Sequence, residues 1–128
     1  MALNNVVAKF KDGTILKGKT SDFFPNKKLF HLEQQDGKTV DINIEKLKAL
    51  FFVKELIGNK SHKKTYDDVI PGGGRKIQVM FSDGEVITGY SHGYSPNRSG
   101  FFVIPADTKG NNKRIFIINS ATEKITFP

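Results

Sequence analysis

The chemically most specific stretch of this 128-residue chain is a loop between two apolar segments, residues 94–98. A Pro-Asn pair in it fixes a turn. Beside that pair stand an arginine, whose planar fork of donors suits carboxylates and phosphates, and a tyrosine ring. Such a loop can recognise a planar or anionic group. The candidate ligand- or partner-binding residues are Tyr94, Asn97, Arg98 and, if their strand pairs beside the loop, Lys113 and Arg114. The alternative is turn chemistry alone, with Tyr94 packed.

A second candidate surface is electrostatic. The net charge is +7, and residues 1–64 hold 13 basic and 7 acidic side chains against 7 and 6 in residues 65–128. A basic half suggests an anionic partner such as nucleic acid, a nucleotide, an acidic protein or a membrane surface. The candidate phosphate-tracking lysines are Lys9, Lys11, Lys17 and Lys19. The alternative is a solvated sheet face that only aids solubility.

Signals for catalysis are absent from the sequence pattern. There is no cysteine, and none of the histidines (His31, His62 and His92) stands near a serine or aspartate in nucleophile-and-base spacing. No His/Asp/Glu cluster has metal-ligand spacing. Residues 72–76 are not a phosphate loop, because the strand–GxxxxGK[ST]–helix context is missing. We therefore predict no enzyme, no cofactor and no metal.

The elements that would position these residues are strands. Residues 10–18 and 81–89 both read as an apolar strand, an Asp-Gly turn and a second strand ending in glycine. In the first copy, a three-residue loop with Gly13 in the left-handed region puts Val6, Ala8 and Phe10 on one face and the lysines on the other. The pattern predicts β-hairpins at both places.

The two copies belong to an internal duplication. Phe10 and Phe81 are 71 positions apart (81 − 10), and the same offset links two glycine pairs and Pro25 with Pro96. After the third strand the offset becomes 75, which a four-residue insertion in the turn at 105–112 explains. Residues 48–53 are apolar enough to be a strand covered on both faces. We predict an all-β protein of two tandem five-stranded small barrels, residues 1–53 and 75–128, joined by a linker at 54–74.

Two resemblances follow from these motifs. The run from Val79 through Phe81, Asp83 and Gly84 to Gly89, with five short strands, resembles Sm-like and SH3-like small barrels. The segments 48–53, 100–107 and 111–116 resemble an uncharacterised bacterial domain family found alongside PilZ-type signalling domains. That resemblance implies a regulatory setting. The PilZ arginine motif and the second Sm motif, which contacts RNA, are both missing from this chain.

These observations favour a non-catalytic bacterial regulatory or protein-interaction module whose partner is another protein. A nucleic-acid-binding protein using the lysine-rich face is the alternative, and a cyclic-dinucleotide-linked signalling domain that takes an anionic nucleotide is the third hypothesis. No run approaches the roughly 20 apolar residues of a membrane span. The N-terminus lacks the blocks of a signal peptide. We expect a cytoplasmic protein.

Overall fold

The structure is a computed structural model that describes residues 3–56, 68, 72–107 and 109–128. These residues form ten β-strands and two short 3₁₀ turns, with no α-helix among them. The elements are β1 (Asn4–Phe10), β2 (Ile15–Thr20), β3 (Leu29–Gln34), β4 (Thr39–Asn43), η1 (Ile44–Lys46), β5 (Leu47–Val53), β6 (Arg75–Phe81), β7 (Val86–Ser91), β8 (Gly100–Pro105), β9 (Asn112–Ile118), η2 (Asn119–Ala121) and β10 (Thr122–Thr126). The prediction of an all-β fold is confirmed.

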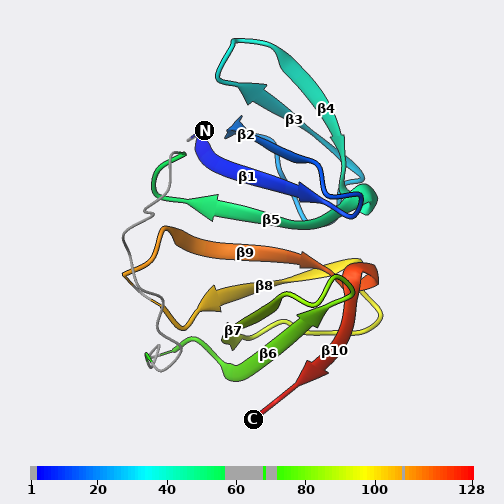
Figure 1. The fold of residues 1–128 in the computed structure, drawn as a ribbon, viewed down its shortest axis with the longest axis vertical. Coiled ribbons are helices and arrows are strands. Elements are labelled where there is room, and N and C mark those ends of the chain that lie inside the picture. The colour runs from blue at the N-terminus through cyan, green and yellow to red at the C-terminus, as the bar shows by residue number, and fades with distance from the viewer. Residues whose placement is uncertain (1–2, 57–67, 69–71, 108) are drawn as a thin grey trace.

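All ten strands belong to one antiparallel sheet in the order β10-β6-β7-β8-β9-β5-β1-β2-β3-β4. Each half of the chain supplies five neighbouring strands, and β5 of the first half pairs with β9 of the second (Figure 1). β4 and β10 are the ends of the order, so the sheet is not closed. The prediction of two tandem barrels is therefore not confirmed. The physical reason is that apolar β5 and β9 satisfy their backbone edges with each other, which joins the halves into one sheet.

The duplication is visible in the element positions. β1, β2 and β3 begin 71 residues before β6, β7 and β8, and η1 and β5 begin 75 residues before η2 and β10. Within each half the fifth strand pairs with the first, and the first four pair in sequence. The same sequence pattern has thus produced the same strand order twice.

The Asp-Gly hairpins have the predicted three-residue loops. In the first, the Phe10 amide donates to the Thr14 carbonyl at 2.9 Å, and Gly13 has a φ of 93°. The Asp12 carboxylate accepts from the Thr14 amide at 2.9 Å, and this hydrogen bond holds the pKa of Asp12 below its usual value. A side chain would be strained at that φ, so glycine fits the position. The hairpin at 81–85 repeats these bonds.

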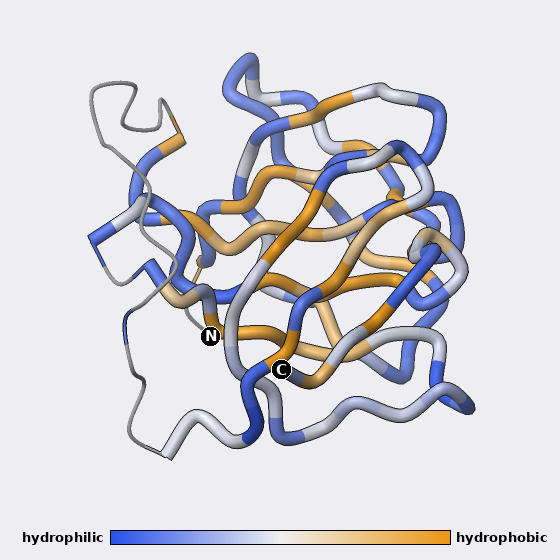
Figure 2. Tube along the Cα trace, turned by 60° about the horizontal axis from the view of Figure 1, so that its bottom comes forward, coloured by the Kyte–Doolittle hydropathy of each residue, from blue (hydrophilic) through white to orange (hydrophobic). Residues whose placement is uncertain are grey.

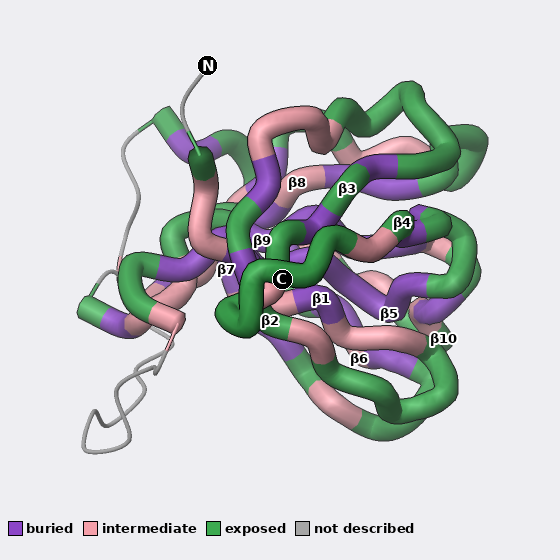
Figure 3. Tube along the Cα trace, turned by 90° about the horizontal axis from the view of Figure 1, so that it is seen from above, coloured by how far each residue is buried: buried purple, intermediate pink, exposed green. Residues whose placement is uncertain are grey.

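Two cores lie on opposite faces of the central strands. Every residue of β5 is buried, as expected for a strand covered on both faces. Its alternating side chains divide between the cores: Ala49 and Phe51 join the second half, whereas Leu50 and Phe52 join the first. β9 divides in the same way. Apolar residues follow the strands and polar residues the loops in Figure 2, and burial is concentrated along the strands in Figure 3. Each half therefore completes the core of the other.

A buried cation also ties the halves together. The Lys48 ammonium on β5 contacts Asp83 at 2.7 Å and Glu85, both on the second hairpin, and lies 4.7 Å from the ring centre of Phe81. Burial alone would lower the pKa of Lys48, but its hydrogen bonds with the two carboxylates outweigh burial and raise that pKa. The hydrogen bond from Lys48 lowers the pKa of Asp83.

The predicted linker, residues 54–74, begins with residues attached to the second half. The Lys54 amide donates to the Asn111 carbonyl at 2.8 Å, and the Glu55 amide donates to Oδ1 of Asn111 at 3.0 Å. Leu56 packs against the core of the second half. Residues 57–67 and 69–71, which include His62, lie outside the described residues.

Candidate functional site

A cleft of about 580 Å³ lies where the β2–β3 loop of the first half meets the strands of the second. Its volume falls in the range of small-ligand and peptide-side-chain sites. Five of its described lining residues are large and apolar or aromatic and come from β7, β8 and β9. They are Tyr90, Phe101, Phe102, Ile104 and Phe116, of which Phe101 belongs to the core of the second half. Pro25 and Asn26 line it from the first half, and His92 and Arg98 from the β7–β8 loop.

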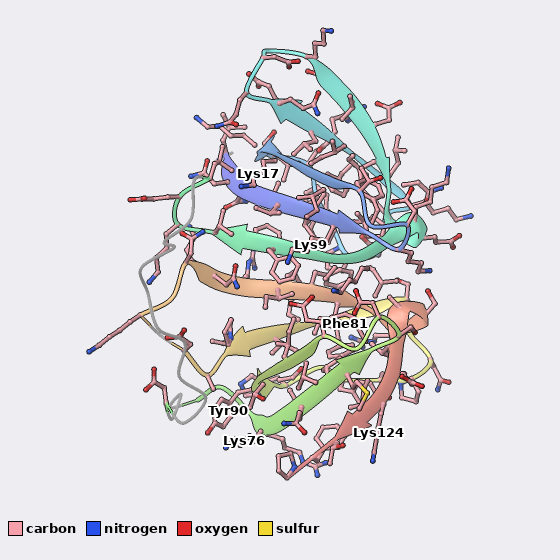
Figure 4. All side chains as sticks on the ribbon, in the orientation of Figure 1. Lys9, Lys17, Lys76, Phe81, Tyr90 and Lys124 are labelled. Carbon is pink, nitrogen blue, oxygen red and sulfur yellow. The ribbon has the colours of Figure 1, made fainter. Side chains whose placement is uncertain are left out.

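Strand register assembles the apolar floor. Tyr90 on β7 is opposite Ile104 on β8, and Phe102 is opposite Phe116 on β9. Residues two apart on β8 share a face, so these four side chains form one surface. Phe116 is 1% exposed, whereas Ile104 is 37% exposed and Tyr90 is half-buried. Figure 4 shows Tyr90 beside Lys76, its partner across the β6–β7 ladder.

The deep end of the floor continues into an aromatic cluster. The Phe116 ring lies edge-to-face with Phe102 at 5.0 Å and with Phe23 of the β2–β3 loop at 5.1 Å. Phe23 also contacts Phe30 and Phe52. This cluster holds the β2–β3 loop against the second half and thereby fixes one wall of the cleft.

Two arginines stand beside this floor. The Arg114 guanidinium lies 4.3 Å from the ring centre of Phe52 and 4.8 Å from that of Phe102, so its position is set by stacking. Arg98 is exposed, and its carbonyl accepts from the Asn119 side-chain amide at 2.7 Å. Within the described part of the chain, neither arginine forms an ion pair with a carboxylate.

The other loop residues of the first candidate site do not line the cleft. Tyr94 packs against Phe101 at 5.0 Å and Phe127 at 5.6 Å, which is the packing role left open as the alternative. Asn97 is exposed, and its amide donates to Oγ of Ser95 at 3.4 Å. Lys113 is exposed on β9. Of the five candidates, Arg98 therefore lines the cleft, and Arg114 contacts the floor residue Phe102 without being a lining residue itself.

Sequence reasoning missed the floor of the cleft. The sequence pattern predicts strands that contain Ile104 and Tyr90, but it assigns neither residue a role in binding. A signal was present in residues 101–104, where four apolar side chains in succession leave no polar face for solvent.

Comparison with known proteins places the chain in a protein family. Residues 2–127 match a family of unknown function, DUF6982. The chain belongs to the DUF6982 family. No curated protein and no solved structure matches it. The family match covers both halves of the sheet, so the duplicated architecture and the cleft lie within one family unit.

In this DUF6982 chain, the first half supplies an internal comparison for the cleft. The 71-residue offset relates Tyr90 to Lys19 and Ile104 to Glu33, and the 75-residue offset relates Phe116 to Asp41. The same surface of the same local fold is thus charged in one half and apolar in the other. The junction explains buried Phe116, but it does not explain the exposed area of Ile104.

The charged counterpart forms a small network in the first half. Nδ1 of His31, the equivalent of Phe102, contacts Asp22 at 2.6 Å, and Nε2 lies 3.3 Å from Asp41. The hydrogen bond with Asp22 raises the pKa of His31. Burial alone would raise the pKa of Asp22, but hydrogen bonds from the His31 side chain and backbone outweigh it and lower that pKa.

The candidate lysine surface divides into two pairs. Register places Lys17 and Lys19 on the face predicted, and both are exposed without a carboxylate partner among the described residues. Lys9 instead lies 4.6 Å from the ring centre of Phe51. Lys11 donates to the Glu45 carbonyl at 2.8 Å and to Oγ of Ser120 at 2.6 Å, which links the two halves.

The described residues contain no group of three or more His, Asp or Glu side chains placed to hold a metal ion. No helix in the described ranges is long and apolar enough to cross a membrane.

Proposed function

We propose that this DUF6982 chain is a non-catalytic protein-interaction module that binds a segment of another protein in the cleft between its halves. The observation that carries the proposal is the apolar floor of the cleft. The proposal keeps the bacterial, cytoplasmic and regulatory setting predicted from the sequence.

The contrast between the two halves supports an occupant for the cleft. Lys19 and Glu33 on the first half also line a hollow, of about 410 Å³, and both of these side chains are charged and exposed, as expected where a sheet face meets water. At the equivalent positions Tyr90 and Ile104 leave apolar area exposed beside a hollow. Exposed apolar area that adjoins a concavity is typical of a binding site.

The free edges of the sheet support a side-chain-mediated contact over strand addition. At the internal junction, Phe116 on β9 and Ala49 on β5 point toward the neighbouring half. Their equivalents at the open ends are Asp41 on β4 and Lys124 on β10, both exposed. Charged side chains at an edge strand oppose pairing with another chain.

The nucleic-acid hypothesis has less support than the cleft. A phosphate backbone would have to compete with the internal contacts of Lys9 and Lys11. Of the four candidate lysines, Lys17 and Lys19 lack a carboxylate partner and an internal ammonium contact within the described residues, and two phosphate contacts give a shallow salt dependence. A salt-sensitive shift of a random-sequence oligonucleotide that Lys17→Glu abolishes would favour nucleic acid over the proposal.

A displayed library of random short peptides, selected on the immobilised full chain, tests the proposed function. We expect enriched peptides whose binding falls at least about tenfold in Ile104→Lys, because a buried unpaired ammonium costs several kcal/mol. Glu33→Lys at the equivalent position of the first half is the matched control and should bind normally. The proposal fails if no peptide is enriched, or if both variants affect binding equally.

A further inference from the structure

Cationic side chains lie at the cleft. Arg98 is among the described lining residues, and none of those residues is a carboxylate. Arg114 stacks on Phe102, a floor residue, and Lys76 is the ladder partner of Tyr90. A cleft with cationic surroundings and an apolar floor differs in electrostatics from the first half, where carboxylates occupy the equivalent surface.

We propose that the partner segment is acidic: an extended peptide that places an aromatic or aliphatic side chain on Tyr90 and Ile104 and a neighbouring carboxylate on Arg114. This inference rests on the proposed function and specifies its ligand. Arg98 provides a second cation on the loop side of the same cleft.

Arg114 is arranged to receive a carboxylate. Its guanidinium group lies 4.3 Å from the ring centre of Phe52 and 4.8 Å from that of Phe102. These contacts position the exposed side chain, and a guanidinium group carries N–H donors that can pair bidentately with a carboxylate. Because the side chain is already positioned, little rotamer entropy is lost on binding.

The anchor position follows from the register. Val103 on β8 is opposite Ile115 on β9, so the next residues along the two antiparallel strands, Ile104 and Arg114, are neighbours on the other face. Tyr90 lies opposite Ile104 on its other side. An apolar contact and a carboxylate contact are therefore adjacent across the strands. Neighbouring residues of one bound peptide can make both.

The first half again shows the contrast. The equivalents of Ile104, Phe102 and Phe116 are Glu33, His31 and Asp41, and the last two contact each other. An acidic peptide would meet carboxylates there instead of an apolar floor. An acidic peptide with an apolar side chain should therefore bind the surface of the second half and not its equivalent on the first half, because the two surfaces differ in charge and in hydrophobicity.

The test uses a peptide enriched on the full chain and a copy of it in which every Asp and Glu is replaced by Asn and Gln. Binding is measured by fluorescence polarisation of the labelled peptides at two salt concentrations. We expect the amide copy to bind about 10- to 100-fold more weakly, as for a lost charge-assisted hydrogen bond. Arg114→Gln should weaken the acidic peptide by the same factor and leave the amide copy unchanged. Thr39→Gln, at the equivalent position on β4, is the control.

The outcomes separate the two proposals. Equal affinity of the two peptides, with binding still abolished by Ile104→Lys, overturns the acidic ligand and retains the cleft. If Arg114→Gln weakens binding of both peptides equally, the acidic ligand is also overturned, because Arg114 then supports the cleft without contacting a carboxylate. Thermal unfolding of each variant shows whether the variant is folded. Peptides insensitive to Ile104→Lys overturn the proposed function itself.

Discussion

Replacing Phe116 by alanine tests whether the two halves share their cores. Phe116 belongs to β9 in the second half, but its ring is buried in the core of the first, 5.1 Å from Phe23 and 5.0 Å from Phe102. Truncating a buried phenylalanine costs about 3–5 kcal/mol of unfolding free energy. That is a third or more of the about 5–15 kcal/mol that stabilises a typical domain.

The assay is urea unfolding combined with amide hydrogen exchange. We expect a lower urea midpoint at unchanged slope. We also expect loss of exchange protection at Phe30 and Leu32, which lie in the first half although the substitution is in the second. Phe116→Leu, at about 1 kcal/mol, provides a milder variant if alanine prevents folding. Asp41→Ala, at the equivalent exposed position of β4, is the control and should change stability by about 0.5 kcal/mol or less.

Independent halves would give a different result. If Phe116→Ala lowered exchange protection only in residues 75–126 and left Phe30 and Leu32 unchanged, the two halves would not share their cores. Two separate urea transitions, of which only one moved, would lead to the same conclusion.

Three further predictions concern charge and backbone. Lys48 lowers the pKa of Asp83, so the ion pair stabilises the fold above the ordinary carboxyl pKa of 3.8, and this stability is lost as pH falls through the lowered pKa. In Lys48→Met, the urea midpoint should therefore fall less steeply as the pH is lowered. The raised pKa of His31 means that its contribution is complete below 6.5 and is lost as pH rises through the raised value; Asp22→Asn should return the imidazole pKa toward 6.5 in an NMR titration, and an unchanged titration would contradict the contact. A Cβ at Gly89 would overlap the Ile104 carbonyl, so Gly89→Ala should lower the free energy of unfolding by about 1–3 kcal/mol in thermal or urea unfolding. A variant as stable as the wild type would show that the β8 backbone moves to accept the methyl group.

Local sequence patterns were sufficient for the hairpins and the duplication. Asp12 and Gly13 specify a turn through their own hydrogen bonds and backbone freedom, which need no information from distant residues. The apolar run of β5 also indicated cover on both faces. That run could not identify the neighbouring strand, because any apolar strand could pair beside β5 and bury it. The partner is β9, and the clue in its sequence was apolar Phe116 at a position where solvent-facing alternation expects a polar residue.

The candidate site was predictable only in part, for the same reason. Arg98 was predicted because it follows Pro-Asn in a loop, and Arg114 because its strand was expected to pair beside that loop. Tyr94 has the composition of a binding residue but occupies the position equivalent to Phe23, which packs on the same kind of neighbours. The floor residues Tyr90 and Ile104 come from separate strands. Only the register brings them together, and period-two alternation does not specify which strands pair.

Chemical-shift mapping of an enriched acidic peptide on the isotope-labelled full chain tests the cleft most directly. We expect perturbed signals at Tyr90, Ile104 and Arg114, with the signals of the equivalent residues Lys19, Glu33 and Thr39 unchanged. Perturbations centred on Lys17 and Lys19, or spread equally over the two halves, would contradict this expectation.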